Sequence, residues 1–209
     1  MNHGPRARGS ARAKLLAAAS ARFYAHGVAS TGIDAITADA GVAKMSLYNN
    51  FSSKAELVAA YLDRRQQEFL DLHHRRVAAL PADAGPGARA LAVFDAYLEH
   101  AEATDGFRGC GLLNAAGELS SDDPAREAVA RHKAEVEQLL RDALEPLDTA
   151  DTLAEHLSLL LEGAMVRAGL EGDTARLRRA RRLAAQLIEQ ADEAGRPGAS
   201  TAGVRWRGE

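Results

Sequence analysis

One short segment of the sequence carries side chains suited to contacting a nucleic acid. From residue 43 to residue 49 the chain reads Ala-Lys-Met-Ser-Leu-Tyr-Asn. A cation attracts phosphate, hydroxyl and amide groups donate to phosphates or base edges, and a thioether can touch a thymine methyl group. The segment therefore predicts a helix that enters a DNA groove. The side chains that this helix would expose are Lys44, Met45, Ser46, Tyr48 and Asn49.

The elements around this segment are those of a helix-turn-helix. Short helices are expected over residues 32–39 and 43–49, and Gly41 between them suits a backbone position with positive φ. The sequence Thr-Gly-Ile-Asp at residues 31–34 resembles a capping box with Asp in the fourth place. A small apolar core would fix the angle between the two helices, and it comprises Ile33, Ile36, Val42 and Leu47.

The next helix, expected over residues 54–79, begins with a cation. Ser53 and Glu56 have the spacing of a capping box, and Lys54 lies in the first turn. A cation is unfavourable at a helix N-terminus, where free N–H groups favour an anion. We therefore expect a DNA phosphate beside Lys54.

Charge is distributed unevenly along the chain. Residues 1–60 hold seven basic and three acidic residues, a net charge of +4, whereas residues 61–209 hold 19 and 26, a net charge of −7. A basic N-terminal segment followed by an acidic remainder indicates that residues 1–60 contact a polyanion. The alternative is that the excess of basic residues over residues 1–60 is due to chance.

Composition indicates a globular, all-α protein. The 209 residues are 46% hydrophobic and 26% charged, and helix-forming Ala, Leu and Arg dominate. One Cys cannot form an internal disulfide, which fits a reducing compartment. No apolar run reaches 18 residues, and Arg22 interrupts the signal-like stretch that follows the basic N-terminus. We expect a cytoplasmic protein that does not enter a membrane.

Helical periodicity and turn residues divide the chain into two domains. A DNA-binding domain is expected over residues 1–53 with a mobile arm over 1–9, a second domain over 54–194, and a flexible tail over 195–209. The other helices expected from apolar spacing and caps are 10–26, 87–103, 112–119, 124–145, 150–170 and 174–193.

The second domain contains residues that could line a largely apolar ligand cavity. Asn114 and Glu118 are four residues apart and would share one helix face as its polar groups. The remaining candidates are Phe94, Tyr97, Phe107, Cys110, His156, Leu161 and Met165. The alternative is that these residues are core and that Glu118 pairs at the surface.

Catalytic and metal-binding patterns are not found in the sequence. His73, His74 and His100 lack metal-ligand spacing, and no nucleophile–base set or phosphate loop stands out. We expect no enzyme, metal or cofactor.

Cys110 has no resolving cysteine in the chain, so oxidation sensing is a secondary alternative. The alternative of another class is a helical interaction module or an enzyme on a bundle fold.

Residues 10–57 resemble the TetR family of bacterial transcriptional repressors. The segments that carry the resemblance are 23–27, 31–36, 40–51 and 53–57. It implies a nine-helix subunit whose first three helices bind DNA and whose other helices bind a ligand and dimerise. The family's DNA contacts map onto Thr31, Lys44, Met45, Ser46, Tyr48, Asn49 and Lys54. The family often has His in place of Asn49 and a small residue in place of Met45.

The resemblance also implies how the protein works. It would be a homodimer, joined through its last two helices, that binds a palindromic operator and leaves it when an apolar or amphipathic small molecule binds. Residues 107–118 resemble a motif of a subgroup associated with efflux or drug response. A regulator of the same fold that responds to a protein partner, or to oxidation at Cys110, is the alternative.

Overall fold

The computed structural model describes residues 5–195, with side chains from residue 11 onward, and this part of the chain forms nine α-helices without a strand. The all-α class is confirmed. The helices are α1 (Pro5–His26), α2 (Ile33–Ala40), α3 (Lys44–Tyr48), α4 (Lys54–Ala78), α5 (Pro86–Glu102), α6 (Gly111–Ala116), α7 (Pro124–Leu144), α8 (Ala150–Glu171) and α9 (Ala175–Ala194).

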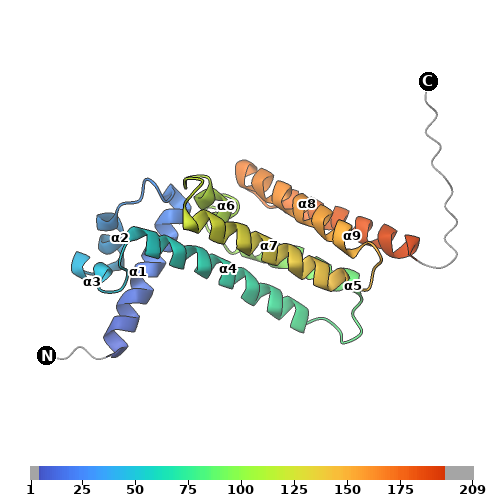
Figure 1. Cartoon of the computed structure of the whole chain (residues 1–209), viewed down its shortest axis with the longest axis horizontal. Coiled ribbons are helices and arrows are strands. Elements are labelled where there is room, and N and C mark those ends of the chain that lie inside the picture. The colour runs from blue at the N-terminus through green and yellow to red at the C-terminus, as the bar shows by residue number, and fades with distance from the viewer. Residues whose placement is uncertain (1–4, 196–209) are drawn as a thin grey trace, which may run out of the picture.

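Helices α1, α2 and α3 gather at one end of the elongated molecule (Figure 1). Their interior is small and apolar, with Phe23, Ile36 and Leu47 almost fully buried. Gly41 ends α2 with a left-handed φ of 63°, as expected for the turn of a helix-turn-helix. Arg22 of α1 forms a bidentate ion pair with Asp39 of α2, at 2.5 and 2.8 Å. These contacts fix α2 and α3 on α1.

The remaining helices form one larger packed body. Helix α4 starts beside α1 and then runs along α5 and α7, whereas α8 and α9 pack on each other on the far side (Figure 1). The core that joins them includes Phe94 of α5, Leu140 of α7 and Leu161 of α8. Because α4 packs against both α1 and the larger body, it links the two ends mechanically.

Several helix ends differ from those expected. Helix α1 begins at Pro5, so residues 5–9 of the predicted arm are helical, while residues 1–4 and 196–209 lie outside the described part. Helix α6 ends at Ala116 instead of residue 119, with Gly117 as its C-cap. The predicted capping box at residues 31–34 is wrong, because Gly32 is the N-cap of α2 and no side chain caps it.

Among residues 5–195, none of the helices combines the length and the apolarity that crossing a membrane requires.

Candidate nucleic-acid interface

The outer face of α3 exposes both apolar and polar side chains. Leu47 is fully buried and anchors the helix, and the side chains of the other positions project away from it. Met45 is 70% exposed and Tyr48 is 48% exposed, which is unusual for large apolar side chains. Lys44 and Asn49 are also exposed, and Ser46 is half-buried. The face offers a thioether, a phenol, a cation and an amide to a partner.

Lys44 is held by a neighbour within the helix-turn-helix. Its Nζ lies 2.7 Å from Oδ1 of Asp34, on α2. The hydrogen bond to Asp34 and its charge raise the pKa of Lys44. Both side chains are mostly exposed, and such pairs contribute little to stability. The ammonium can therefore exchange Asp34 for a phosphate at small cost.

Thr31 lies apart from this face. It is buried, and its hydroxyl donates to the carbonyl of Gly27 at 2.6 Å, which closes the turn between α1 and α2. The structure thus gives Thr31 a role in holding that turn, and its side chain is not free in this conformation.

The start of α4 contains an anion as well as a cation. Ser53 accepts a hydrogen bond from the backbone N–H of Glu56 at 3.1 Å, as predicted for its cap. The Glu56 carboxylate binds the hydroxyl and N–H of Ser52, at 2.7 and 2.6 Å, instead of the N–H of Ser53. These hydrogen bonds lower the pKa of Glu56. Glu56 therefore already complements the N-terminus of α4, so the helix end does not by itself require a phosphate beside Lys54.

Arg12 belongs with this surface although no motif pointed to it. Its guanidinium lies 4.6 Å from the ring centroid of Phe51, which sits in the turn between α3 and α4. The side chain is exposed, and its charge lowers the pKa of nearby Glu56. The only indication of its role in the sequence was the excess of basic residues over residues 1–60. Arg12 and Lys54 thus place two cations around the same turn.

Four of the predicted ligand residues surround an enclosed cavity of about 30 Å³ in the larger body. Tyr97, Phe107, Cys110 and Met165 line it. Phe94 and Leu161 are fully buried in the core instead. The buried position of Cys110 gives oxidants little access to its thiol, which does not favour the oxidation alternative.

The other three predicted ligand residues lie elsewhere. Asn114 is exposed, and its Nδ2 donates to the carbonyl of Arg108 at 3.0 Å. Because α6 ends at Ala116, Glu118 does not share the helix face of Asn114, and its carboxylate accepts from the N–H of Ala29 at 2.7 Å. His156 is exposed on α8.

A partly buried polar cluster in the larger body was not predicted from the sequence. Nζ of Lys133 on α7 donates to the Tyr97 hydroxyl at 3.1 Å and to Oε1 of Glu162 on α8 at 2.8 Å. Burial raises the pKa of Tyr97. Oε2 of Glu162 is buried and has no partner among the described residues. Lys133 and Glu162 interrupt the apolar patterns of their helices, but their pairing depends on how α7 and α8 pack.

The described part of the chain holds no group of three or more His, Cys, Asp or Glu side chains suited to a metal ion.

Comparison with known proteins agrees with this architecture. Residues 15–61 match the model of bacterial regulatory proteins of the tetR family, and residues 86–184 match that of the tetracyclin repressor-like C-terminal domain. A TetR transcriptional regulator from Streptomyces avermitilis is 34% identical, with 87% of this chain and 98% of that chain covered and a TM-score of 0.69. The chain belongs to the TetR family.

Two further solved structures of TetR-family regulators are similar over nearly the whole chain. That from Streptomyces coelicolor is 29% identical, covers 90% of this chain and 96% of its own, and has a TM-score of 0.76. That from Chloroflexus aurantiacus is 27% identical, covers 88% and 97%, and has the same TM-score. No curated protein matches the chain. This TetR-family member is a transcriptional regulator with a DNA-binding helix-turn-helix, and not an enzyme.

Proposed function

We propose that this regulator is a homodimeric repressor that binds a palindromic operator and is released by a small molecule. The observation that carries the proposal is the face of α3, where Met45 and Tyr48 are exposed. The turn that follows α3 adds two cations, because Arg12 lies over Phe51 and Lys54 begins α4. Lys44, Tyr48 and Lys54 would hold phosphates, and Met45 and Ser46 would lie nearest the base edges. Two-fold symmetry would place the two α3 helices in major grooves about 34–36 Å apart or a multiple of it.

An exposed apolar stripe on α8 supports a dimer. Leu159, Val166 and Leu170 are exposed, and Gly163 lies between them at the same alternating spacing of three and four residues. Apart from the adjoining backbone of α8, no atom of the described residues lies within 4 Å of where a Cβ of Gly163 would be. A stripe of this spacing suits packing against another helix, and a glycine within it permits close approach. Leu183 adds an exposed apolar side chain on α9.

The enclosed cavity supports a small-molecule effector. Its walls are mostly apolar and aromatic, with Arg65, Gln66 and His100 as polar members. Tyr97 also lines it and joins the Lys133–Glu162 pair. A cavity of about 30 Å³ is far smaller than a typical ligand, so a ligand can enter only in a more open state. A ligand shifts the balance of two states only by its differential affinity, and about 3 kcal/mol would give about 150-fold release.

Selection of bound sequences from a random DNA pool tests the proposal. The wild-type protein should enrich a palindrome, and the Tyr48→Ala variant should weaken binding to it without unfolding. Repeating the selection with a compound library should identify a class of molecule that abolishes enrichment. Failure to enrich a palindrome at low salt would refute the homodimeric repressor.

A further inference from the structure

A groove of about 950 Å³ lies between the DNA-binding helices and the larger body. Helix α1 forms one wall, α4 forms the other, and the end of α5 with its following loop closes it. Ala17, Ala21 and Ala25 repeat every four residues along α1 and are exposed into this space. Helix α1 thus presents a narrow, smooth, weakly apolar wall.

The opposite wall carries two guanidinium groups that share one carboxylate. Arg64 and Arg65 of α4 lie 2.8 and 2.9 Å from the two oxygens of Glu68. Asp71 and Asp105 add two negative charges to the lining, and Arg75 and Arg108 add two positive ones. Arginine side chains therefore exceed carboxylates by one in the groove, although the whole chain has a net charge of −3.

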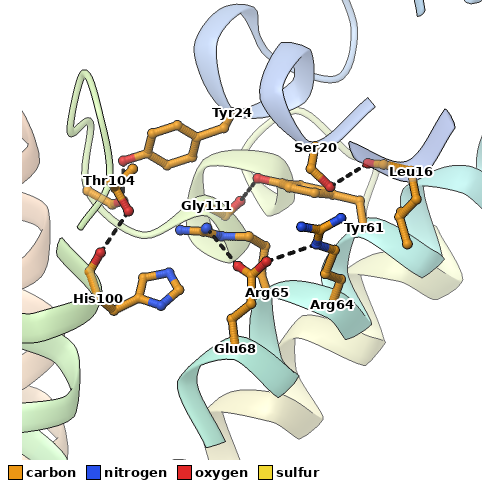
Figure 2. A network of polar contacts seen from close by, with 11 residues as sticks. Leu16, Ser20, Tyr24, Tyr61, Arg64, Arg65, Glu68, His100, Thr104 and Gly111 are labelled. Atoms are coloured by element: carbon orange, nitrogen blue, oxygen red, sulfur yellow. Dashed lines mark hydrogen bonds and ion pairs between the residues drawn. The ribbon is translucent and has the colours of Figure 1, made fainter. Parts of the chain in front are cut away.

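Arg65 is the best-placed group for an anion. Its side chain is only 15% exposed, and its guanidinium extends from α4 into the space between Tyr24 and His100 (Figure 2). The guanidinium carbon lies 5.2 Å from the centroid of the Tyr24 ring. Nε of Arg65 is buried and has no acceptor among the described residues. A buried donor without an acceptor is costly, and an anion beside the guanidinium would stabilise its charge and accept from its terminal N–H groups.

One polar side chain at the closed end of the groove, that of His100, is uncharged at neutral pH. Burial, and then the charge of Arg65, lower the pKa of His100 to about 4. The Thr104 hydroxyl donates to the carbonyl of His100 at 2.7 Å (Figure 2). His100 therefore neither repels Arg65 nor competes with it for an anion, and its imidazole can still hydrogen-bond.

We propose that this groove binds a small amphipathic organic anion, with its carboxylate at Arg65 and its apolar body along the alanine wall of α1. The ligand would touch the DNA-binding helices and the larger body at once. Its affinity would therefore depend on the position of α1 relative to α4, which couples it to operator affinity. This effector role rests on the proposed function, whereas binding of the anion does not.

Titration of the full-length protein with 2-naphthoate, followed by its fluorescence, tests the binding site. The neutral 2-naphthamide is the matched ligand without the charge. We expect saturable naphthoate binding below about 1 mM, a level that corresponds to about 4 kcal/mol. The amide should bind at least about tenfold more weakly, a loss of about 1.4 kcal/mol. Arg65→Gln should remove that preference. Equal affinities, or no saturable naphthoate binding, would overturn the proposal.

Arg65 and His100 border both the groove and the enclosed cavity, so the effect of Arg65→Gln does not show which space holds the ligand. The Ala21→Phe variant distinguishes the two spaces. Ala21 is exposed on α1 and lines only the groove of these two spaces, so phenylalanine should block the groove and abolish naphthoate binding. Ala17→Phe provides a second blocking variant. Ala134→Phe, at an exposed position on α7, is the control and should bind like wild type. Undiminished binding by both folded groove variants would overturn the assignment.

Operator release is measured separately. Naphthoate should release wild-type protein from the selected operator, and Ala21→Phe should bind the operator but resist release. Binding of naphthoate without any release would overturn the effector role, although the site itself would stand. Failure of all variants to bind DNA would instead count against the proposed function, because the titration does not involve DNA.

Discussion

At the scale of the residue, the Lys54→Ala variant tests whether Lys54 contacts a DNA phosphate. Lys54 opens α4, where Glu56 already supplies an anion through its contacts with Ser52. If Lys54 contacts a phosphate, Lys54→Ala should weaken binding to all sequences similarly. The slope of log affinity against log salt should also fall by about 1 for each subunit. Gel-shift titrations at several salt concentrations measure both effects.

Arg131→Ala provides the control for this prediction. It removes an equal charge on α7, where Arg131 pairs with exposed Glu127 at 3.0 Å. Its salt dependence should match that of wild type. A Lys54→Ala variant that changes the preference at a single base pair would contradict the assignment to phosphate.

His100 should make folding sensitive to acid. Its pKa is lowered from 6.5 to about 4 in the folded protein, first by burial and then by Arg65. Between these values the unfolded chain binds a proton that the folded chain does not, so stability falls as pH drops. The linkage amounts to about 2 kcal/mol at most between pH 7 and pH 5. Urea unfolding at both pH values should show a larger loss for wild type than for His100→Gln.

Burial lowers the pKa of His73 as well. Part of the acid sensitivity should therefore remain in His100→Gln, and His73→Gln should reduce it independently. Equal losses of stability for wild type and His100→Gln would mean that His100 is protonated in the folded protein.

Sequence reasoning succeeded for residues whose environment is local. The spacing of α3 predicted that Leu47 is buried while Met45 and Tyr48 are exposed, and the structure agrees. Sequence reasoning failed where the hydrogen-bond partner of a side chain is a backbone group far away in the sequence. The Glu118 carboxylate binds the N–H of Ala29, 89 residues away, which no periodicity could indicate.

At the scale of the element, the loop after α5 clamps the end of α1. The Arg108 guanidinium donates to the carbonyls of Tyr24 and Ala25 in the last turn of α1. Carbonyls in the last turn of a helix have no donor within the helix, so Arg108 supplies one. The Tyr24 hydroxyl accepts from the N–H of Arg108 at 2.7 Å and donates to the carbonyl of Gly109 at 3.1 Å. Close packing completes the clamp, because a Cβ on Gly169 of α8 would lie 2.7 Å from Cα of Gly109. The DNA-binding helices are thereby tied to α8.

Tyr24→Phe should loosen this clamp. It removes a hydroxyl that makes two hydrogen bonds and leaves the partly buried N–H of Arg108 without that acceptor. We expect the free energy of unfolding to fall by about 1–3 kcal/mol. Hydrogen exchange should quicken at the amide of Arg108. Tyr48→Phe removes an exposed hydroxyl of α3 and should change stability by less than about 0.5 kcal/mol.

Helix positions were predictable to within a few residues because caps are local signals. Asp123 accepts from the N–H of Ala125 at 2.8 Å and begins α7 before Pro124, as the sequence indicated. The α5–α6 loop was unpredictable for the opposite reason. Its conformation depends on Tyr24 of α1 and Gly169 of α8, which lie 84 and 61 residues from Arg108.

At the scale of the whole molecule, the unpaired surface of α8 is best explained by a second subunit. His156 was expected in a cavity, but it lies on the exposed stripe that continues through Leu159, Gly163, Val166 and Leu170. Exposed apolar stripes of this kind mark interfaces rather than solvent-facing helices. The sequence shows that these positions are mostly apolar, but only the fold shows that no other part of residues 5–195 covers them.

Leu170→Asp should separate the proposed dimer. Leu170 is 78% exposed, so aspartate there should cost the folded subunit little. In a symmetric interface each dimer would bury two unpaired carboxylates and lose two leucine contacts. Association should weaken by about 10³-fold or more, about 4 kcal/mol. Analytical ultracentrifugation should then detect monomers at micromolar concentration. Val77→Asp, at an exposed apolar position on α4, should leave the dimer intact. A Leu170→Asp protein that still sediments as a dimer would place the interface on another surface, and operator affinity should then be unchanged too.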